Sequence, residues 1–190
     1  IPAVYINGLP ISVNQFGRFV FKVFEYLEDN RNPMKFIRIF ESKFINYEEM
    51  LGLENKEEAN NKVKKYYMIK YLKDNVYAGG IEEWREVFKE QLEKNEENFK
   101  DDKENNEYLF KKLVLENLLK LLFILKGYFT NSTENISLKE LSLNLVELFK
   151  KYLLGKDKTY NEIKGRLVDV LYEFIKYGDE SKKYNYSDAV

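Results

Sequence analysis

The chain has 190 residues, of which 44% are hydrophobic and 33% are charged, and its 31 basic and 32 acidic residues give a net charge near −1. These values are typical of a soluble globular protein with one or two compact domains. Because the sequence contains no cysteine and no histidine, it excludes disulfides, cysteine nucleophiles, Ser-His-Asp triads and metal sites that use either residue.

Hydrophobic periodicity predicts an almost entirely helical protein, with a strand signal only at Ala3–Ile6. The first helix is expected to begin at Ser12, where the spacing to Gln15 fits a capping box. The second is expected to begin at Pro33, with Asn32 as its N-terminal cap. These two helices form a predicted helix–turn–helix pair.

The central part of the chain predicts three further helices, over 46–53, 56–77 and 81–99. Residues 93–107 are charged and poor in apolar side chains, and we interpret them as a surface hinge or frayed connection. The helix expected over 108–129 is the most apolar, because its apolar residues cover well over half of its circumference. That distribution predicts a central position or an oligomer interface.

Two more helices are expected near the end of the chain, over 137–152 and 159–177. Ser137 and Thr159 each open a capping box, with a glutamate three residues later. The tail after Gly178 is polar and is interpreted as frayed.

The two helical pairs resemble each other. A shift of 125 residues superimposes Ser12 on Ser137 and Phe24 on Phe149. The likeness is one of pattern, and any two capped amphipathic helices would share it. The expected fold is all-α, in a single domain over residues 1–190, with two pseudosymmetric helix–turn–helix halves (11–45 and 136–177) around a long central apolar helix.

Residues 61–73 form the strongest nucleic-acid candidate, because they contain five lysines, no acidic residue and interleaved tyrosines. Lysines bind phosphates, and tyrosine rings stack on unpaired bases. The second helix of the first pair adds further basic residues. The alternative is an amphipathic helix with solvated lysines. The candidate RNA-binding residues are Lys62, Lys64, Lys65, Lys70, Lys73, Tyr66, Arg31, Lys35 and Arg38.

Residues 82–107 have the opposite charge, with eleven acidic and five basic side chains. They would repel a polyanion, and they are either a solvated helix face or a surface that complements a basic face of another subunit. Asp101, Asp102 and Glu104 are the only hint of a carboxylate metal site. We therefore expect no metal, no cofactor and no enzymatic activity.

The chain resembles the early-gametocyte (sexual-stage) protein family of Plasmodium. The resemblance lies in the segment from Ile6 to Phe19, in the paired capped halves, and in the many lysine, asparagine and tyrosine residues, which A/T-rich codons encode. The resemblance implies a helical homodimer that binds RNA, is phosphorylated and acts in sexual differentiation. It also implies a signalling partner of the SH3 type, although Pro2, Pro10 and Pro33 form no Pro-x-x-Pro segment.

The leading hypothesis is a non-enzymatic, cytoplasmic, homodimeric protein that binds RNA through lysine and tyrosine side chains. The alternative is a helical scaffold or protein-interaction module that binds no nucleic acid. A membrane partner is not expected, because the sequence has no stretch of about 20 uncharged apolar residues.

Overall fold

The computed structural model describes residues 5–6, 9–10, 15–52, 65–77, 79–100, 102, 104–129, 135–153, 158–179 and 182–185. These residues are mostly helical, as the sequence predicts. The helices are α1 (Gln15–Glu28), α2 (Pro33–Phe40), α3 (Tyr47–Leu51), α4 (Lys65–Asn75), α5 (Ile81–Asn98), α6 (Asn106–Lys126), α7 (Leu138–Tyr152) and α8 (Lys158–Tyr177). Two short antiparallel sheets pair β1 (Tyr5–Ile6) with β2 (Leu9–Pro10) and β3 (Asn135–Ser137) with β4 (Lys183–Asn185).

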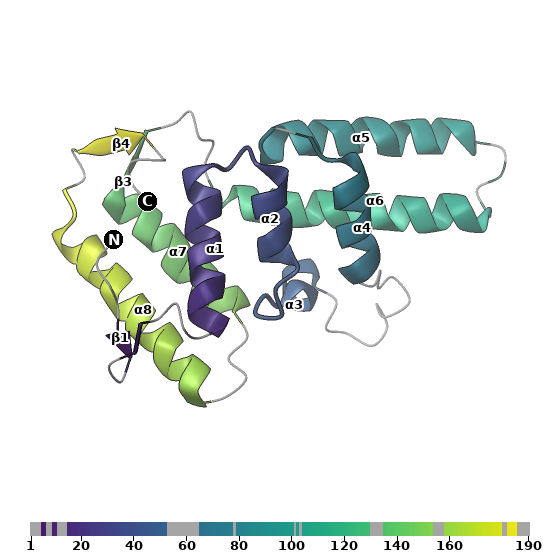
Figure 1. The fold of residues 1–190 in the computed structure, drawn as a ribbon. Helices are drawn as coiled ribbons and strands as arrows, with labels where there is room; N and C mark the ends of the chain where they lie inside the picture. The colour runs from purple at the N-terminus through teal and green to yellow at the C-terminus, as the bar shows by residue number, and fades with distance from the viewer. Residues whose placement is uncertain are drawn as a thin grey trace.

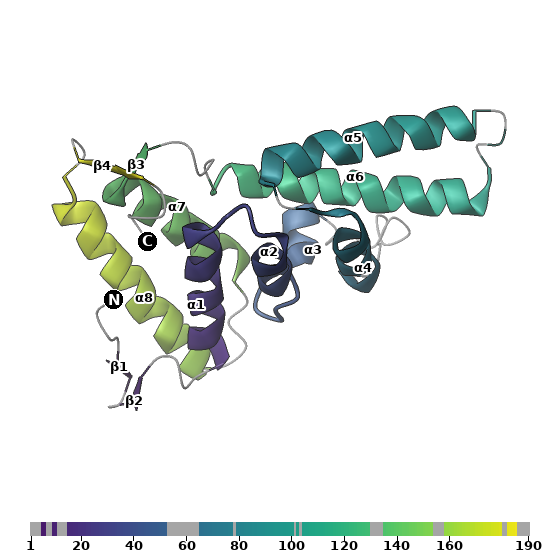
Figure 2. The ribbon, with the colours of Figure 1, turned by 45° about the horizontal axis from the view of Figure 1, so that its top comes forward.

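The helices are arranged as a body with one projecting hairpin. Figures 1 and 2 show α1 between α2 and the α7–α8 pair, and they show α5 and α6 as an antiparallel hairpin that extends to one side. Helix α4 lies beside this hairpin and beside α2. A continuous cluster of buried apolar side chains runs through all eight helices and holds the hairpin to the body.

Two of the predicted helix caps are confirmed. The Asn32 side-chain oxygen accepts hydrogen bonds from the backbone N–H groups of Met34 (3.1 Å) and Lys35 (3.4 Å), and Pro33 takes the first helical position of α2. The Ser137 hydroxyl accepts a hydrogen bond from the Glu140 N–H at 3.1 Å. Ser12 lies outside the described residues. The capping box predicted to begin at Thr159 is wrong, because α8 begins at Lys158 and Thr159 already lies within the helix.

The interpretation of residues 93–107 as a hinge is wrong for its first part, because α5 continues to Asn98. Polar side chains stabilise this end of the hairpin. Asn95 is buried and donates to the Tyr108 carbonyl oxygen at 3.3 Å, while Lys112 pairs with Glu96 at 2.9 Å. These contacts order a segment whose composition indicates a loop.

Other boundaries also differ from the predictions. The described part of the helix expected over 56–77 is α4, which ends at Asn75, and residues 53–64 lie outside the described residues. The C-terminal tail is not frayed throughout, because β4 pairs with β3. Near the N-terminus, Leu9-Pro10 forms a second strand, β2, that the sequence did not predict. Backbone pairing explains both differences, since ladder hydrogen bonds do not require apolar side chains.

The helix lengths of the two predicted halves differ: α1 and α2 have 14 and 8 residues, whereas α7 and α8 have 15 and 20. An isolated bridge between Ile45 and Leu153 joins the halves, and the Asn46 N–H donates to the Tyr152 carbonyl oxygen at 2.8 Å. The C-terminal part of α6 enters the shared core, and its N-terminal part lies in the projecting hairpin. The pseudosymmetry and the central role of α6 stay predictions.

Candidate nucleic-acid interface

Helix α4 carries most of the described candidate residues. Its apolar side is held by Met68 and Leu72, which are fully buried, so the opposite side of the helix faces solvent. Lys62 and Lys64 lie outside the described residues. The remaining seven candidates are on α4, on α2 or in the turn before α2.

Lys65 does not point to solvent as a phosphate-binding lysine would. Its Nζ donates to the Ser42 carbonyl oxygen at 2.5 Å and lies over the rings of Phe40 (5.5 Å) and Tyr47 (5.7 Å). Burial lowers the pKa of Lys65 to about 8, and the nearby carboxylate of Glu41 opposes this shift only partly. Lys65 therefore joins α4 to α2 and α3.

Three more candidate cations are in ion pairs. Lys73 contacts Glu41 at 2.5 Å, Lys35 contacts Asp29 at 3.4 Å and Arg31 contacts Glu83 at 3.6 Å. Exposed ion pairs contribute little to stability, on the order of 0–1 kcal/mol. However, each acidic partner cancels a positive charge locally, which weakens the attraction of this surface for phosphate.

Arg38, Lys70 and Tyr66 are the candidates that keep the predicted exposure. All three side chains are solvent-exposed, and within the described part of the chain neither Arg38 nor Lys70 makes an ion pair. Among the described candidates, the predicted basic surface is therefore reduced to one cation on α2 and one cation and one tyrosine on α4.

Tyr66 belongs to an exposed aromatic patch that the sequence did not predict. Tyr67 on α4 packs edge-to-face against Phe110 on α6, with ring centroids 5.1 Å apart, and Tyr66 packs against Tyr67 at 5.4 Å. Tyr66, Tyr67 and Phe110 have exposed fractions of 66%, 41% and 47%, and we call them the aromatic patch. The sequence of α6 indicates exposed apolar surface, because its apolar residues cover more of the helix than one core contact can bury.

The acidic segment expected to repel polyanions is largely helix α5. Glu82 accepts a hydrogen bond from Arg85 at 3.0 Å and also pairs with Lys126 of α6, and Glu90 pairs with Lys94 at 3.8 Å. The hydrogen bond from Lys126 is the main cause that lowers the pKa of Glu82. Part of the negative charge is thus neutralised across the hairpin.

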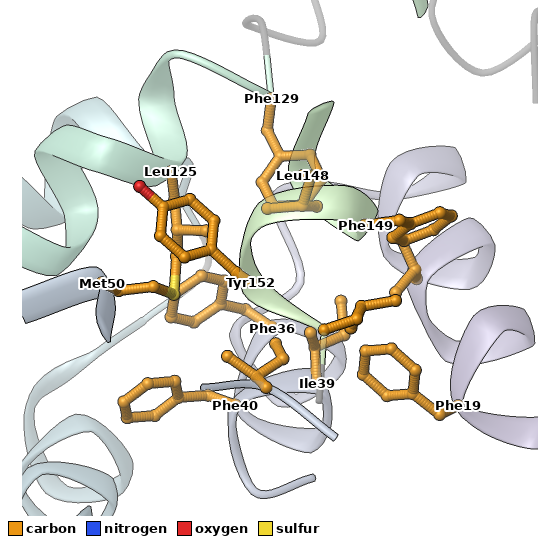
Figure 3. Close-up of a pocket in the computed structure, with 13 residues that line it drawn as sticks. Phe19, Phe36, Ile39, Phe40, Met50, Leu125, Phe129, Leu148, Phe149 and Tyr152 are labelled. Atoms are coloured by element: carbon orange, nitrogen blue, oxygen red, sulfur yellow. The ribbon is translucent and has the colours of Figure 1, made fainter. Parts of the chain in front are cut away.

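A small apolar cavity of about 20 Å³ lies where α1, α2, α3, α6 and α7 meet. Figure 3 shows the side chains that surround it, including Phe19, Phe36, Phe149 and Tyr152. Ligand pockets are typically about 300–1,000 Å³, and an apolar cavity near the size of one water molecule stays dry. This cavity is therefore a packing defect in the core and too small for a metabolite.

No protein-family model, curated protein or solved structure matches this chain. Among the residues described above, no group of three or more aspartate or glutamate side chains is placed to hold a metal ion. None of the described helices is both long and apolar enough to cross a membrane.

Proposed function

We propose that the protein is a non-enzymatic helical interaction module that associates with a second copy of itself through the aromatic patch. This is the alternative that the sequence left open, combined with the expected homodimer. The observation that supports it is the exposure of three aromatic side chains, which contact one another across α4 and α6. Exposed apolar clusters mark interaction sites, and tyrosine is enriched at the centres of interfaces.

The charges beside the patch favour a second copy as the partner. Helix α4 exposes Lys70 and Asp74, four residues apart, and neither makes an ion pair with another described residue. A symmetric dimer places the same surface of both copies in contact, so a surface that carries charges of both signs can pair with itself.

Sedimentation equilibrium at about 1–100 μM, the range of weak to moderate self-association, tests this proposal. We expect a dimer for the parent chain and a dissociation constant at least tenfold higher for the double variant Tyr66→Ser and Phe110→Ser. Tyr177→Ser is the matched control, because Tyr177 is 70% exposed on α8, away from the patch. A parent chain that stays monomeric, or a double variant with unchanged association, contradicts the proposal.

RNA binding is the second candidate function, and the sexual-stage role implied by the resemblance belongs with it. The observation that favours it is the exposure of Arg38, Lys70 and Tyr66, two cations and an aromatic ring of the kind that bind single strands. Such binding would be electrostatic and would tolerate many sequences.

Fluorescence anisotropy with an RNA of about 20 nucleotides across KCl concentrations separates the two functions. Replacing Arg38 and Lys70 by Glu is expected to weaken binding at least tenfold and to lower the salt slope by about 2. The control replaces Arg18 and Lys22, an equally exposed Arg and Lys on α1, by Glu. Absence of binding by the parent chain contradicts an RNA-binding function, and binding that does not weaken with salt contradicts the electrostatic mode proposed for it.

A further inference from the structure

Helix α4 lies beside both α2 and α6 but buries few side chains against them (Figure 1). Only Met68 and Leu72 of its eleven residues are buried, whereas α1 buries seven of fourteen and α7 seven of fifteen. Helix α5 buries four of eighteen, but these include Trp84 and Phe88, and it packs along α6. Because packing of an apolar face supplies most of the stability of a helix in a protein, α4 is weakly anchored.

Two lysines attach α4 to the body, and both contacts end at the same place. Lys65 donates to the Ser42 carbonyl oxygen at 2.5 Å, and Lys73 pairs with Glu41 at 2.5 Å. Glu41 and Ser42 directly follow α2. The start and the end of α4 are therefore both joined to the C-terminal end of one neighbouring helix.

Tyrosines attach α4 to the projecting hairpin. The Tyr71 hydroxyl donates to the side-chain oxygen of Gln91 on α5, and the Tyr71 ring packs against Phe88 with centroids 5.9 Å apart. Tyr67 packs against Phe110 of α6 at 5.1 Å. Helix α4 thus bridges the body and the hairpin through contacts that are made by its side chains.

The sequence of α4 does not favour a helix that persists on its own. Three tyrosines and Ile69 lower its intrinsic helix propensity, because aromatic and β-branched side chains lose rotamer freedom in a helix. With eleven residues, α4 is also shorter than the length at which isolated helices become stable in water. Once its contacts break, α4 should therefore unfold.

We propose that α4 undocks and unfolds separately from the rest of the protein, and that its docking controls self-association through the aromatic patch. The control of association rests on the proposed function, whereas the undocking does not. Two of the three rings of the patch, Tyr66 and Tyr67, belong to α4, and Tyr67 contacts Phe110 of α6 in the docked arrangement. Undocking takes the patch apart.

The coupling acts in both directions. A second copy that binds only the docked state shifts the population toward that state, so association stabilises α4. Conversely, a change that weakens the docking of α4 lowers the apparent affinity between copies, even where it leaves all three rings in place. The contacts at Glu41, Ser42 and Leu72 lie outside the patch and would act on association in this indirect way.

Native-state hydrogen exchange of the full chain at about 1 μM, followed by mass spectrometry, tests the undocking. We expect α4 amides to exchange at least tenfold faster than the slowest amides of α7. Leu145→Ala, in the core of α7, should accelerate those α7 amides about thirtyfold or more and leave α4 unchanged, because α7 stays folded while α4 opens. The milder Ile163→Val gives the same comparison with an acceleration of a few fold. Equal acceleration of α4 and α7 overturns the undocking.

Leu72→Asp tests the control of association, because it prevents docking without changing a ring of the patch. We expect its α4 amides to lose protection, its α7 amides to stay protected, and its dissociation constant in sedimentation equilibrium to rise at least tenfold. Leu143→Asp is the matched control, because Leu143 is an exposed leucine on α7.

The outcomes separate this inference from the proposed function. Association of Leu72→Asp as tight as that of the parent chain overturns the control of association while the dimer stands. Unfolding of the whole Leu72→Asp chain overturns the undocking, since the undocked state must be more stable than the unfolded one. A parent chain that stays monomeric contradicts the proposed function and with it the control of association, whereas the undocking is decided by exchange alone.

Discussion

The Lys164 ammonium group on α8 donates hydrogen bonds to the backbone carbonyl oxygens of Leu153 (3.1 Å) and Lys150 (3.4 Å). These carbonyls lie at the C-terminal end of α7, where backbone acceptors lack helical partners and the helix dipole is negative. Lys120 of α6 donates in the same way to Leu51, the last residue of α3. Part of the lysine excess therefore serves to join helices to the ends of their neighbours.

Lys164→Met should lower the free energy of unfolding by about 1–2 kcal/mol, because it leaves carbonyl acceptors at the end of α7 without a charged donor. The loss stays modest, since burial of the ammonium, which lowers the pKa of Lys164, already has a cost. Urea unfolding followed by circular dichroism measures it. Lys89→Met, at an exposed position of α5, should change stability by less than about 0.5 kcal/mol. Equal effects of the two variants would contradict the capping role.

Lys65 should make stability depend on pH above neutrality. Its folded-state pKa of about 8 lies below that of an unfolded lysine, so between these two values the unfolded chain binds more protons. The buried Lys65 ammonium therefore lowers the free energy of unfolding by its full amount below pH 8, and this loss diminishes as the pH rises above 8. Relative to Lys65→Met, the free energy of unfolding of the parent chain should increase by about 1 kcal/mol between pH 7.5 and 9.5, after allowance for the partial exposure of Lys65.

The control for this pH effect is Lys70→Met, at an exposed position on the same helix. Its stability difference from the parent chain should stay constant over the same interval. Measurements stop at pH 9.5 because burial raises the pKa of Tyr71, and tyrosine ionisation at higher pH would lower stability. If the difference in free energy of unfolding between the parent chain and Lys65→Met does not change with pH, the Lys65 ammonium is not buried.

Asn32→Ala should lower the free energy of unfolding by about 1 kcal/mol, because the N-terminal N–H groups of α2 lose their acceptor. Asn32→Ser should restore most of this stability, since a hydroxyl oxygen also caps and, unlike a carboxylate, does not repel Asp29, to which the Asn32 amide donates at 3.3 Å. Thermal unfolding of the three proteins gives the comparison. If Ser and Ala destabilise equally, the side-chain oxygen is not the stabilising group.

Local rules predicted the helices and their caps, because these depend on residues close in sequence. Asn32 and Ser137 cap the helices that the sequence assigned to them. Composition was misleading for residues 93–98, although periodicity predicted a helix to residue 99: the contact between Asn95 and the Tyr108 backbone holds this charged segment against the other helix of the hairpin. Composition does not register contacts between distant residues.

The candidate site shows the same limit more clearly. Spacing placed Lys65 and Lys73 on a basic stretch but gave no sign that Ser42 and Glu41, more than 20 residues away, would bind their ammonium groups. Likewise, Tyr67 and Phe110 are far apart in sequence and meet only because α4 packs against α6. Charge counted along the chain therefore overestimates the charge available to a partner.

Gly52 ends α3 with a positive φ of 69°, and its N–H donates to the Glu49 carbonyl oxygen at 3.1 Å. Alanine is strained in this left-handed conformation, so Gly52→Ala should lower the free energy of unfolding by about 1 kcal/mol, with a smaller loss for Gly52→Asn. Gly165 is the matched control, because it belongs to the regular helix α8 and an added methyl group there would meet open space. Gly165→Ala should raise stability by up to about 1 kcal/mol, since alanine is the better helix former. Urea unfolding of both variants should therefore give changes of opposite sign, and two changes of the same sign would mean that the backbone at residue 52 is not left-handed.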